Sequence, residues 1–154
     1  MKRRTFLQGT LASSMVGAAV SAGLLTPRMV LAAWPEKAFD AKSVDDGMNA
    51  LFGSVDHKPS GDIKIKAPDI AENGAVVPIT VSTSKSGVES ISVMVEKNPS
   101  PLAANFNLAD NTEGFVSTRV KMGKTSDLIA IVKSGGNLYS AKKQVKVTIG
   151  GCGG

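Results

Sequence analysis

Apolar residues recur at every second position along much of the chain after Gly61. Three runs have this alternation, at residues 63–65, 77–81 and 91–95. A period of two is typical of a strand with one buried face, so each run predicts a half-buried strand. Pro78 has no N–H to donate to a neighbour, so its strand is predicted to be an edge strand or to begin at a bulge.

Turn residues separate these runs and the strands that follow. Asn73-Gly74 can supply positive φ in a turn between the first two runs. Asn98-Pro99-Ser100-Pro101 ends the third strand, and a short extended piece is predicted next, at about 106–108. Residues 115–122 alternate again, with Arg119 and Lys121 facing outward.

The last two predicted strands differ from each other. Residues 128–132 form an unbroken apolar run, as expected for a central strand covered on both faces, and a turn at 134–137 leads into a strand at 138–149. Seven strand candidates at spacings of roughly 8 to 15 residues predict an all-β fold. We expect an immunoglobulin-like antiparallel β-sandwich over about 61–149. The sequence does not predict the order of the strands within its sheets.

Helical periodicity precedes the strands. One face of residues 34–52 carries the apolar side chains, namely Phe39, Val44, Met48, Leu51 and Phe52. Pro35 suits a first helical turn and Gly53 a C-terminal cap, so a single helix over about 35–52 is predicted. Its apolar face is expected on the body of the domain, with docking to a partner chain as the alternative.

Residues 1–32 are predicted to be an export signal outside the fold, with cleavage after Ala32 or Ala33. A basic start precedes an apolar run of small residues from Leu11 to Leu25, which is shorter than the roughly 20 residues of a membrane span. Arg3-Arg4-Thr5-Phe6-Leu7 resembles a twin-arginine signal, although Lys2 and Gln8 depart from its commonest form. The alternative is a general secretory signal. Either one predicts an exported protein without stable membrane insertion.

Charge outside the signal is nearly balanced. The formal charge of the chain is +5, but four of its eighteen basic residues lie in the signal segment, which leaves fourteen basic and thirteen acidic residues. A net charge of +1 gives no support to nucleic-acid binding. The composition therefore predicts one ordinary globular domain with a single core, spanning about 33–149.

The C-terminus carries the one cysteine of the chain, Cys152, between two glycines on each side: Gly150, Gly151, Gly153 and Gly154. A terminal segment of this composition cannot pack into a core, so the thiol is predicted to be a working group on a flexible arm over 150–154. An odd cysteine in an exported chain indicates a reactive thiol or an intermolecular disulfide. From Ile149 the arm reaches about 10 Å to Cys152.

The chain offers Cys152 few catalytic neighbours. His57, the single histidine, lies in a polar loop and is predicted to be a surface residue, so no Cys-His pair is expected. One His and one Cys do not supply a zinc site, and no metal or other cofactor is predicted. Asp45 and Asp46 are adjacent on a helix and so do not face each other. We therefore expect no independent catalysis.

Two groups of basic residues remain open to two interpretations. They are Lys142, Lys143 and Lys146, and Arg119, Lys121 and Lys124. Such residues either attract an anionic ligand or partner, or occupy exposed strand faces where they limit aggregation.

The C-terminal motif, Gly150 to Gly154, resembles that of the SoxY family, the sulfur-carrier subunits of the bacterial Sox thiosulfate-oxidising system. Internal stretches fit the same family: Phe39 to Ser43, Ala67 to Gly74, Glu96 to Leu102 and Ser117 to Met122. The resemblance extends across the mature chain.

The resemblance implies a periplasmic heterodimer with a SoxZ-type subunit. Cys152 would be joined to thiosulfate by a SoxXA-type haem-containing partner. A SoxB-type hydrolase and a SoxCD-type oxidising partner would then process the sulfur intermediates attached covalently to Cys152. Two other functions stay open: a disulfide cross-link between subunits through Cys152, and a ubiquitin-like carrier activated at its terminal Gly-Gly carboxylate, against which the export signal argues. Prenylation is excluded, because two residues follow Cys152 instead of three.

Overall fold

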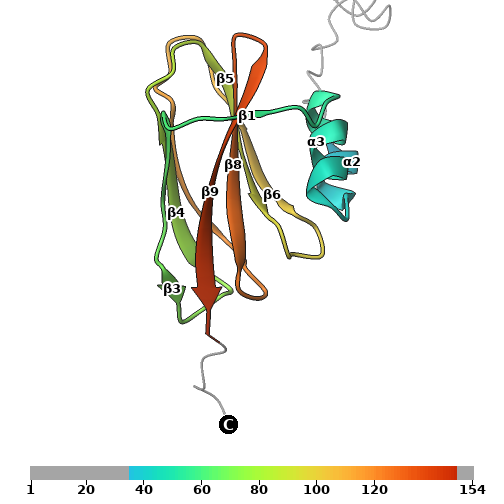
Figure 1. Ribbon diagram of the computed structural model, residues 1–154, viewed down its shortest axis with the longest axis vertical. Coiled ribbons are helices and arrows are strands. Elements are labelled where there is room, and N and C mark those ends of the chain that lie inside the picture. Colours follow the sequence, from blue (N-terminus) through green and yellow to red (C-terminus); the bar gives the residue numbers. More distant parts are fainter. Residues whose placement is uncertain (1–34, 149–154) are drawn as a thin grey trace, which may run out of the picture. The chain divides into compact units, whose positions relative to one another are not determined.

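The computed structural model describes residues 35–148, which form two facing β-sheets with two helices on the outer side of the larger sheet (Figure 1). In order, the elements are α2 (Glu36–Asp40), α3 (Val44–Phe52), β1 (Lys58–Pro59), β2 (Ile63–Lys66), β3 (Ile70–Ala71), β4 (Val77–Thr83), β5 (Val88–Val95), β6 (Leu102–Asn107), β7 (Phe115–Val120), β8 (Ser126–Ser134) and β9 (Asn137–Val147). The predicted signal segment, 1–32, and the predicted arm, 150–154, lie outside the described residues.

The larger sheet has the order β1-β9-β8-β5-β6, with β3 also paired to β9, and the smaller sheet has the order β2-β4-β7. The seven longer strands pair antiparallel, as predicted for an immunoglobulin-like sandwich. The sequence did not predict β1 and β3. Each is two residues long and pairs parallel with β9, so neither carries a side-chain pattern that periodicity could detect.

Strand β8 is buried on both faces, as its apolar run predicted. Leu128, Ala130 and Val132 belong to the core between the two sheets, whereas Ile129 and Ile131 lie in a second cluster under the helices. Full burial of one such aliphatic side chain contributes about 1.5–3 kcal/mol. The strand therefore joins the two layers of the core.

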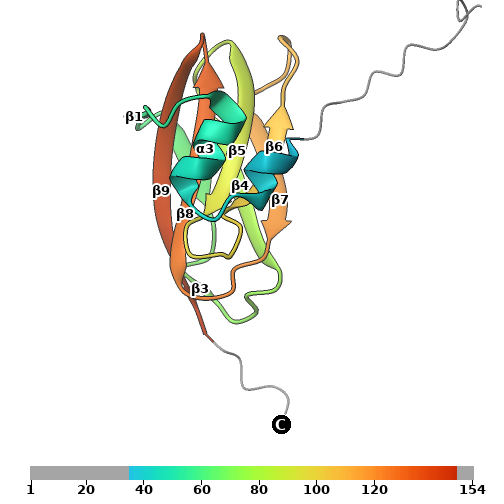
Figure 2. The ribbon, with the colours of Figure 1, turned by 90° about the vertical axis from the view of Figure 1, so that its right-hand side faces the viewer.

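The predicted single helix is wrong: the segment forms two helices that cover the larger sheet (Figure 2). The helix is interrupted at Ser43, because the backbone of this residue is extended. The Ser43 side-chain oxygen accepts a hydrogen bond from the Asp46 N–H at 3.0 Å and so caps the start of α3. Gly53 terminates α3 with a φ of 72°, as predicted. Met48 is buried against the sheet cluster, so the apolar face lies on the domain.

Two further expectations need correction. Pro78 lies in β4, which is the middle strand of its sheet and not an edge strand. Its missing N–H is tolerated because pairing with β2 begins only at Thr80, so β4 is locally an edge at Pro78. Gly74 does not have positive φ; in the described residues that conformation occurs at Gly53, Gly87, Gly135 and Gly136.

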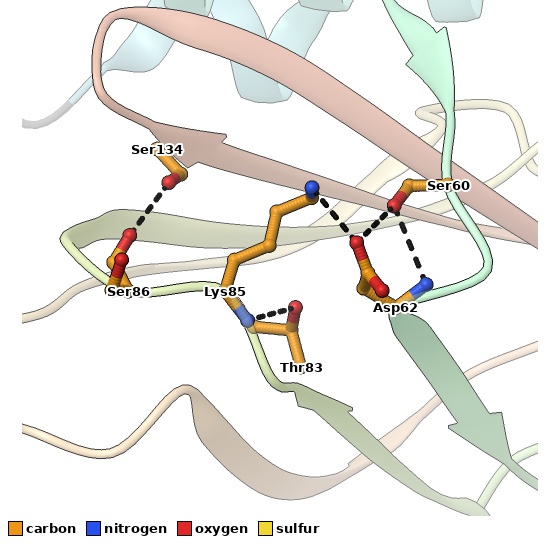
Figure 3. A network of polar contacts seen from close by, with 6 residues as sticks. All are labelled: Ser60, Asp62, Thr83, Lys85, Ser86 and Ser134. Atoms are coloured by element: carbon orange, nitrogen blue, oxygen red, sulfur yellow. Dashed lines mark hydrogen bonds and ion pairs between the residues drawn. The ribbon is translucent and has the colours of Figure 1, made fainter.

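Polar contacts close the end of the sandwich at the β8–β9 hairpin (Figure 3). The Lys85 ammonium lies 3.0 Å from a carboxylate oxygen of Asp62, and Ser60 donates to the same oxygen at 3.2 Å. The hydrogen bond from Lys85, followed by that from Ser60, lowers the pKa of Asp62. Lys85 also stands 3.8 Å from the ring centre of Tyr139 in β9, so this loop lysine links the two sheets.

Candidate functional site

The predicted attachment residue, Cys152, and the predicted arm glycines, Gly150, Gly151, Gly153 and Gly154, lie outside the described residues. The described chain ends at Thr148, one residue after β9. The part of the site that the structure describes is therefore the base from which the C-terminal segment departs, at the lower end of β9 in Figure 1.

Hydrogen bonds hold the end of β9 on both sides. On one side β3 runs parallel to it, with Lys146 N–H donating to the Asp69 carbonyl at 2.9 Å and Thr148 N–H donating to the Ala71 carbonyl at 3.1 Å. On the other side, the N–H of Val147 donates to the side-chain oxygen of Thr125 at 3.0 Å. The backbone is thus anchored up to Thr148.

A close approach at Gly74 completes the base. A Cβ built on Gly74 would lie 2.3 Å from the carbonyl oxygen of Met122 and 2.7 Å from a methyl carbon of Val147. The Gly74 carbonyl accepts a hydrogen bond from the Met122 N–H at 2.7 Å. Only glycine allows the loop between β3 and β4 to lie this close to the end of β9.

The covalent chain limits how far the cysteine can be from this base. Cys152 is four positions after Thr148, and a fully extended chain spans at most about 3.3–3.6 Å per residue. The Cα of Cys152 can therefore lie no more than about 14 Å from that of Thr148.

His57 lies at the other end of the sandwich. It precedes β1, where Lys58 pairs with Tyr139, and its ring Nδ1 is 3.1 Å from the Val55 carbonyl oxygen. It lines an open cleft of about 310 Å³ beside the β8–β9 hairpin. Thr148 is nine positions after Tyr139 along an extended strand, a distance of about 30 Å. Because the arm reaches only about 14 Å, His57 cannot act as a base for Cys152 of the same chain.

The structure brings together three of the lysines that the sequence left in two separate groups. Lys121, Lys124 and Lys146 are exposed and are each next in sequence to a residue that contacts the base: Met122, Thr125 and Val147. Among residues 35–148, none of the three takes part in an ion pair.

The other basic residues of those groups are placed differently. Lys143 is bound to Asp69 at 3.1 Å and to the Ala67 carbonyl at 2.7 Å. Arg119 lies on β7 opposite Pro78, and Lys142 lies farther along β9 opposite Ile129. Lys143 therefore has a structural role beside the base, whereas Arg119 and Lys142 occupy exposed strand positions.

Acidic residues form no metal cluster in the described part of the chain, where no three His, Cys, Asp or Glu side chains gather. Asp46 accepts a hydrogen bond from the Ser43 hydroxyl at 2.7 Å and so belongs to the cap of α3. Within residues 35–148, no helix is long and apolar enough to cross a membrane.

Sequence reasoning did not find the residues that build the base. Thr125 and Ala71 carry no motif, because their roles depend on which strands become neighbours. The sequence predicts Gly74 only as a turn residue, on the strength of the glycine itself. Glycine is required at this position because Met122 and Val147 leave no space for a Cβ atom, and not because the backbone has a positive φ.

Fold and base together define a class of protein: an immunoglobulin-like β-sandwich that anchors its last strand directly before a short cysteine-bearing terminus. The family model for the sulfur oxidation protein SoxY matches residues 48–152, and the chain belongs to this family.

One solved structure agrees with this assignment, and a second shares only the fold. The sulfur carrier protein SoxY from Chlorobium limicola f thiosulfatophilum is 47% identical, with a TM-score of 0.64 over 70% of this chain and 97% of that one. A superoxide reductase (neelaredoxin) from Ignicoccus hospitalis is 20% identical, with a TM-score of 0.50 over 60% of this chain and 81% of that one, which is a likeness of fold alone. No curated protein gave a significant match.

Proposed function

We propose that this protein is a periplasmic sulfur carrier that holds thiosulfate-derived intermediates covalently on Cys152. The observation that carries the proposal is the anchored end of β9, four residues before the single cysteine, in a chain of the SoxY family. A fixed base and a short glycine-rich terminus suit a group that must be presented to several enzymes in turn.

In the proposed reactions this chain supplies only the thiol of Cys152. Loading joins the Cys152 sulfur to the outer sulfur of thiosulfate, with loss of the thiol proton and transfer of two electrons to the haem-containing partner. Water then cleaves the attached group to release sulfate and leaves one sulfur atom on Cys152. An ordinary cysteine has a pKa of about 8.5, so the thiolate is a minor species at neutral pH and its activation falls to the partner's site.

Export and partners follow from the same proposal. The basic start and the short apolar run of residues 1–32 support export by the twin-arginine route, which carries folded proteins. We propose a SoxZ-type subunit as the stable partner. SoxXA-type, SoxB-type and SoxCD-type enzymes act in succession on the attached sulfur, and the carrier itself has no catalytic activity.

Intact-mass measurement tests the carrier role. The mature protein with its SoxZ-type partner is incubated with thiosulfate and the haem-containing enzyme. The expected result is a mass increase of one thiosulfate-derived group that is absent in Cys152→Ser and is removed by a reducing thiol. An unchanged mass of the wild-type protein would contradict the proposal.

The odd cysteine also supports a second function, an intersubunit disulfide. Non-reducing gels separate the two possibilities. A cross-link predicts dimers that are required for activity and lose it on reduction. A carrier predicts that the reduced chain without an intersubunit disulfide, in its complex with the SoxZ-type partner, is the form that accepts thiosulfate.

A further inference from the structure

Two lengths determine which surface of this protein an enzyme must contact: the length of the arm and the depth of the reacting centre below the enzyme's surface. This inference rests on the proposed function. With Cys152 no more than about 14 Å from Thr148, an enzyme whose reacting centre is recessed by most of that length cannot reach the sulfur unless its rim contacts the residues around Thr148. The surface around the base of the arm is then a shared contact of every enzyme that processes the attached sulfur.

The structure describes that surface. It contains the exposed lysines Lys121, Lys124 and Lys146, together with Ile70 of β3, and we name these four residues the collar. Ile70 is 57% exposed and pairs directly with Lys146 across the β3–β9 bridge. A large apolar side chain is thus exposed beside the last residues of β9.

Charge around the base is predominantly positive. Glu72, next to Ala71, is an exposed acid at this end, whereas Asp69 is already bound to Lys143. Asp127 of β8, opposite Gln144 on β9, is a second acid outside any described ion pair, and Glu96 and Lys97 beside it offset each other. Three such lysines therefore stand against two carboxylates near the base. The chain outside the signal has a net charge of only +1, so this excess is local and not a consequence of overall composition.

We propose that the collar is a docking surface for the acidic rim of the enzymes that act on Cys152. The three lysines steer the encounter and orient the arm toward the channel mouth, and Ile70 is covered when the rim seats. Complementary charge of this kind raises association rates more than it raises affinity. A carrier that visits several enzymes needs fast arrival together with easy release.

Charge reversal tests the proposal. The triple variant Lys121→Glu, Lys124→Glu, Lys146→Glu is compared with a matched triple, Lys37→Glu, Lys42→Glu, Lys58→Glu, whose lysines are also exposed and outside any described ion pair. Each is assembled with the SoxZ-type partner and loaded by the haem-containing enzyme at low and at high salt. For the collar triple we expect kcat/KM to fall about tenfold at low salt and to recover toward wild type at high salt. The matched triple should stay within about twofold.

Two small reagents separate docking from other effects. Iodoacetamide is neutral and Ellman's reagent is a small dianion, and both react with the Cys152 thiol without docking. The proposal expects both to modify the collar triple at nearly the wild-type rate. If the reaction with Ellman's reagent slows as much as enzymatic loading does, the lysines act on small anions and the proposal is overturned.

The outcomes also distinguish the two proposals. Equal enzymatic loading of the collar triple and the matched triple overturns the collar while leaving the carrier role intact. Failure of the wild-type protein to load overturns the carrier role itself. Ile70→Ser keeps all charges and provides a second variant: loading should be slower at both salt concentrations, with unchanged thermal unfolding.

Discussion

The side-chain oxygen of Thr125 lies 3.0 Å from the backbone nitrogen of Val147 and accepts its hydrogen bond, immediately before the chain leaves the sandwich. This contact joins the start of β8 to the end of β9. It fills the place that a strand partner would otherwise take, because β8 begins only at Ser126.

Replacing Thr125 by Val should loosen this end of β9. The isosteric side chain leaves the half-buried N–H of Val147 without its acceptor, at a cost of about 1–2 kcal/mol in the free energy of unfolding. We expect faster amide exchange at Val147 and Thr148 before any change elsewhere. Thr112→Val, in an exposed loop, is the control and should leave both quantities unchanged.

Gly74→Ala should destabilise the base through crowding. The new methyl group would lie 2.3 Å from the Met122 carbonyl oxygen, so the loop has to move away from β9. The expected loss is about 1–3 kcal/mol in chemical denaturation. Gly61→Ala meets no atom within 4 Å and is the matched control. Equal stability of the two variants would contradict the packing described here.

Ser43→Ala should weaken α3 without affecting the base of the arm. The substitution removes the oxygen that accepts from the Asp46 N–H, and loss of such a cap costs about 1 kcal/mol. Ser84→Ala changes the same atoms at an exposed loop position. Thermal unfolding should separate the two variants, whereas the rate of Cys152 alkylation should be the same in both.

Acid should selectively remove the contribution of Asp62. Its pKa is lowered in the folded protein by the hydrogen bonds from Lys85 and Ser60, so its contribution is fully present above the unfolded pKa of about 3.9. The contribution is lost as the pH falls through the lowered folded value. The stability difference between wild type and Asp62→Asn should therefore shrink between about pH 5 and pH 2. A constant difference over this range would refute the assignment, and Asp110→Asn is the exposed control.

Bulk on the arm should impair enzymatic loading. Gly151→Val adds a branched side chain and restricts the backbone next to Cys152, so entry into a narrow channel should slow at least about tenfold. Alkylation by iodoacetamide should change little. One extra residue after Gly154 should leave loading intact, because the proposed chemistry uses the thiol and not the terminal carboxylate. Loss of loading in that extended variant would instead favour the carboxylate-activated carrier.

Much of the fold could be predicted because the longer strands carry their own pattern. The alternation at Val77, Ile79 and Val81 and the continuous apolar run of β8 are local properties of the sequence, and both gave the right element. The order of strands is not local. Nor is the pairing of β3, which consists of backbone hydrogen bonds between a two-residue segment and β9.

One missed feature had a readable signal. Ser43 followed by Asp46 is the spacing of a capped helix start, but the apolar periodicity of the whole segment favoured one helix. The base of the arm had no such signal. Lys121 and Lys146 are distant in sequence, and they lie at the same end of the sandwich only because their neighbours Met122 and Val147 both approach Gly74.

The pairing of β9 also determines how the domain responds to mechanical force. Traction on the C-terminal segment acts along β9, while the hydrogen bonds to the antiparallel strand β8 run across it. The load is therefore shared in shear by the whole strand, instead of opening the bonds one after another. Under the proposed carrier function, withdrawal of the C-terminal segment from an enzyme's channel would therefore leave the sandwich folded.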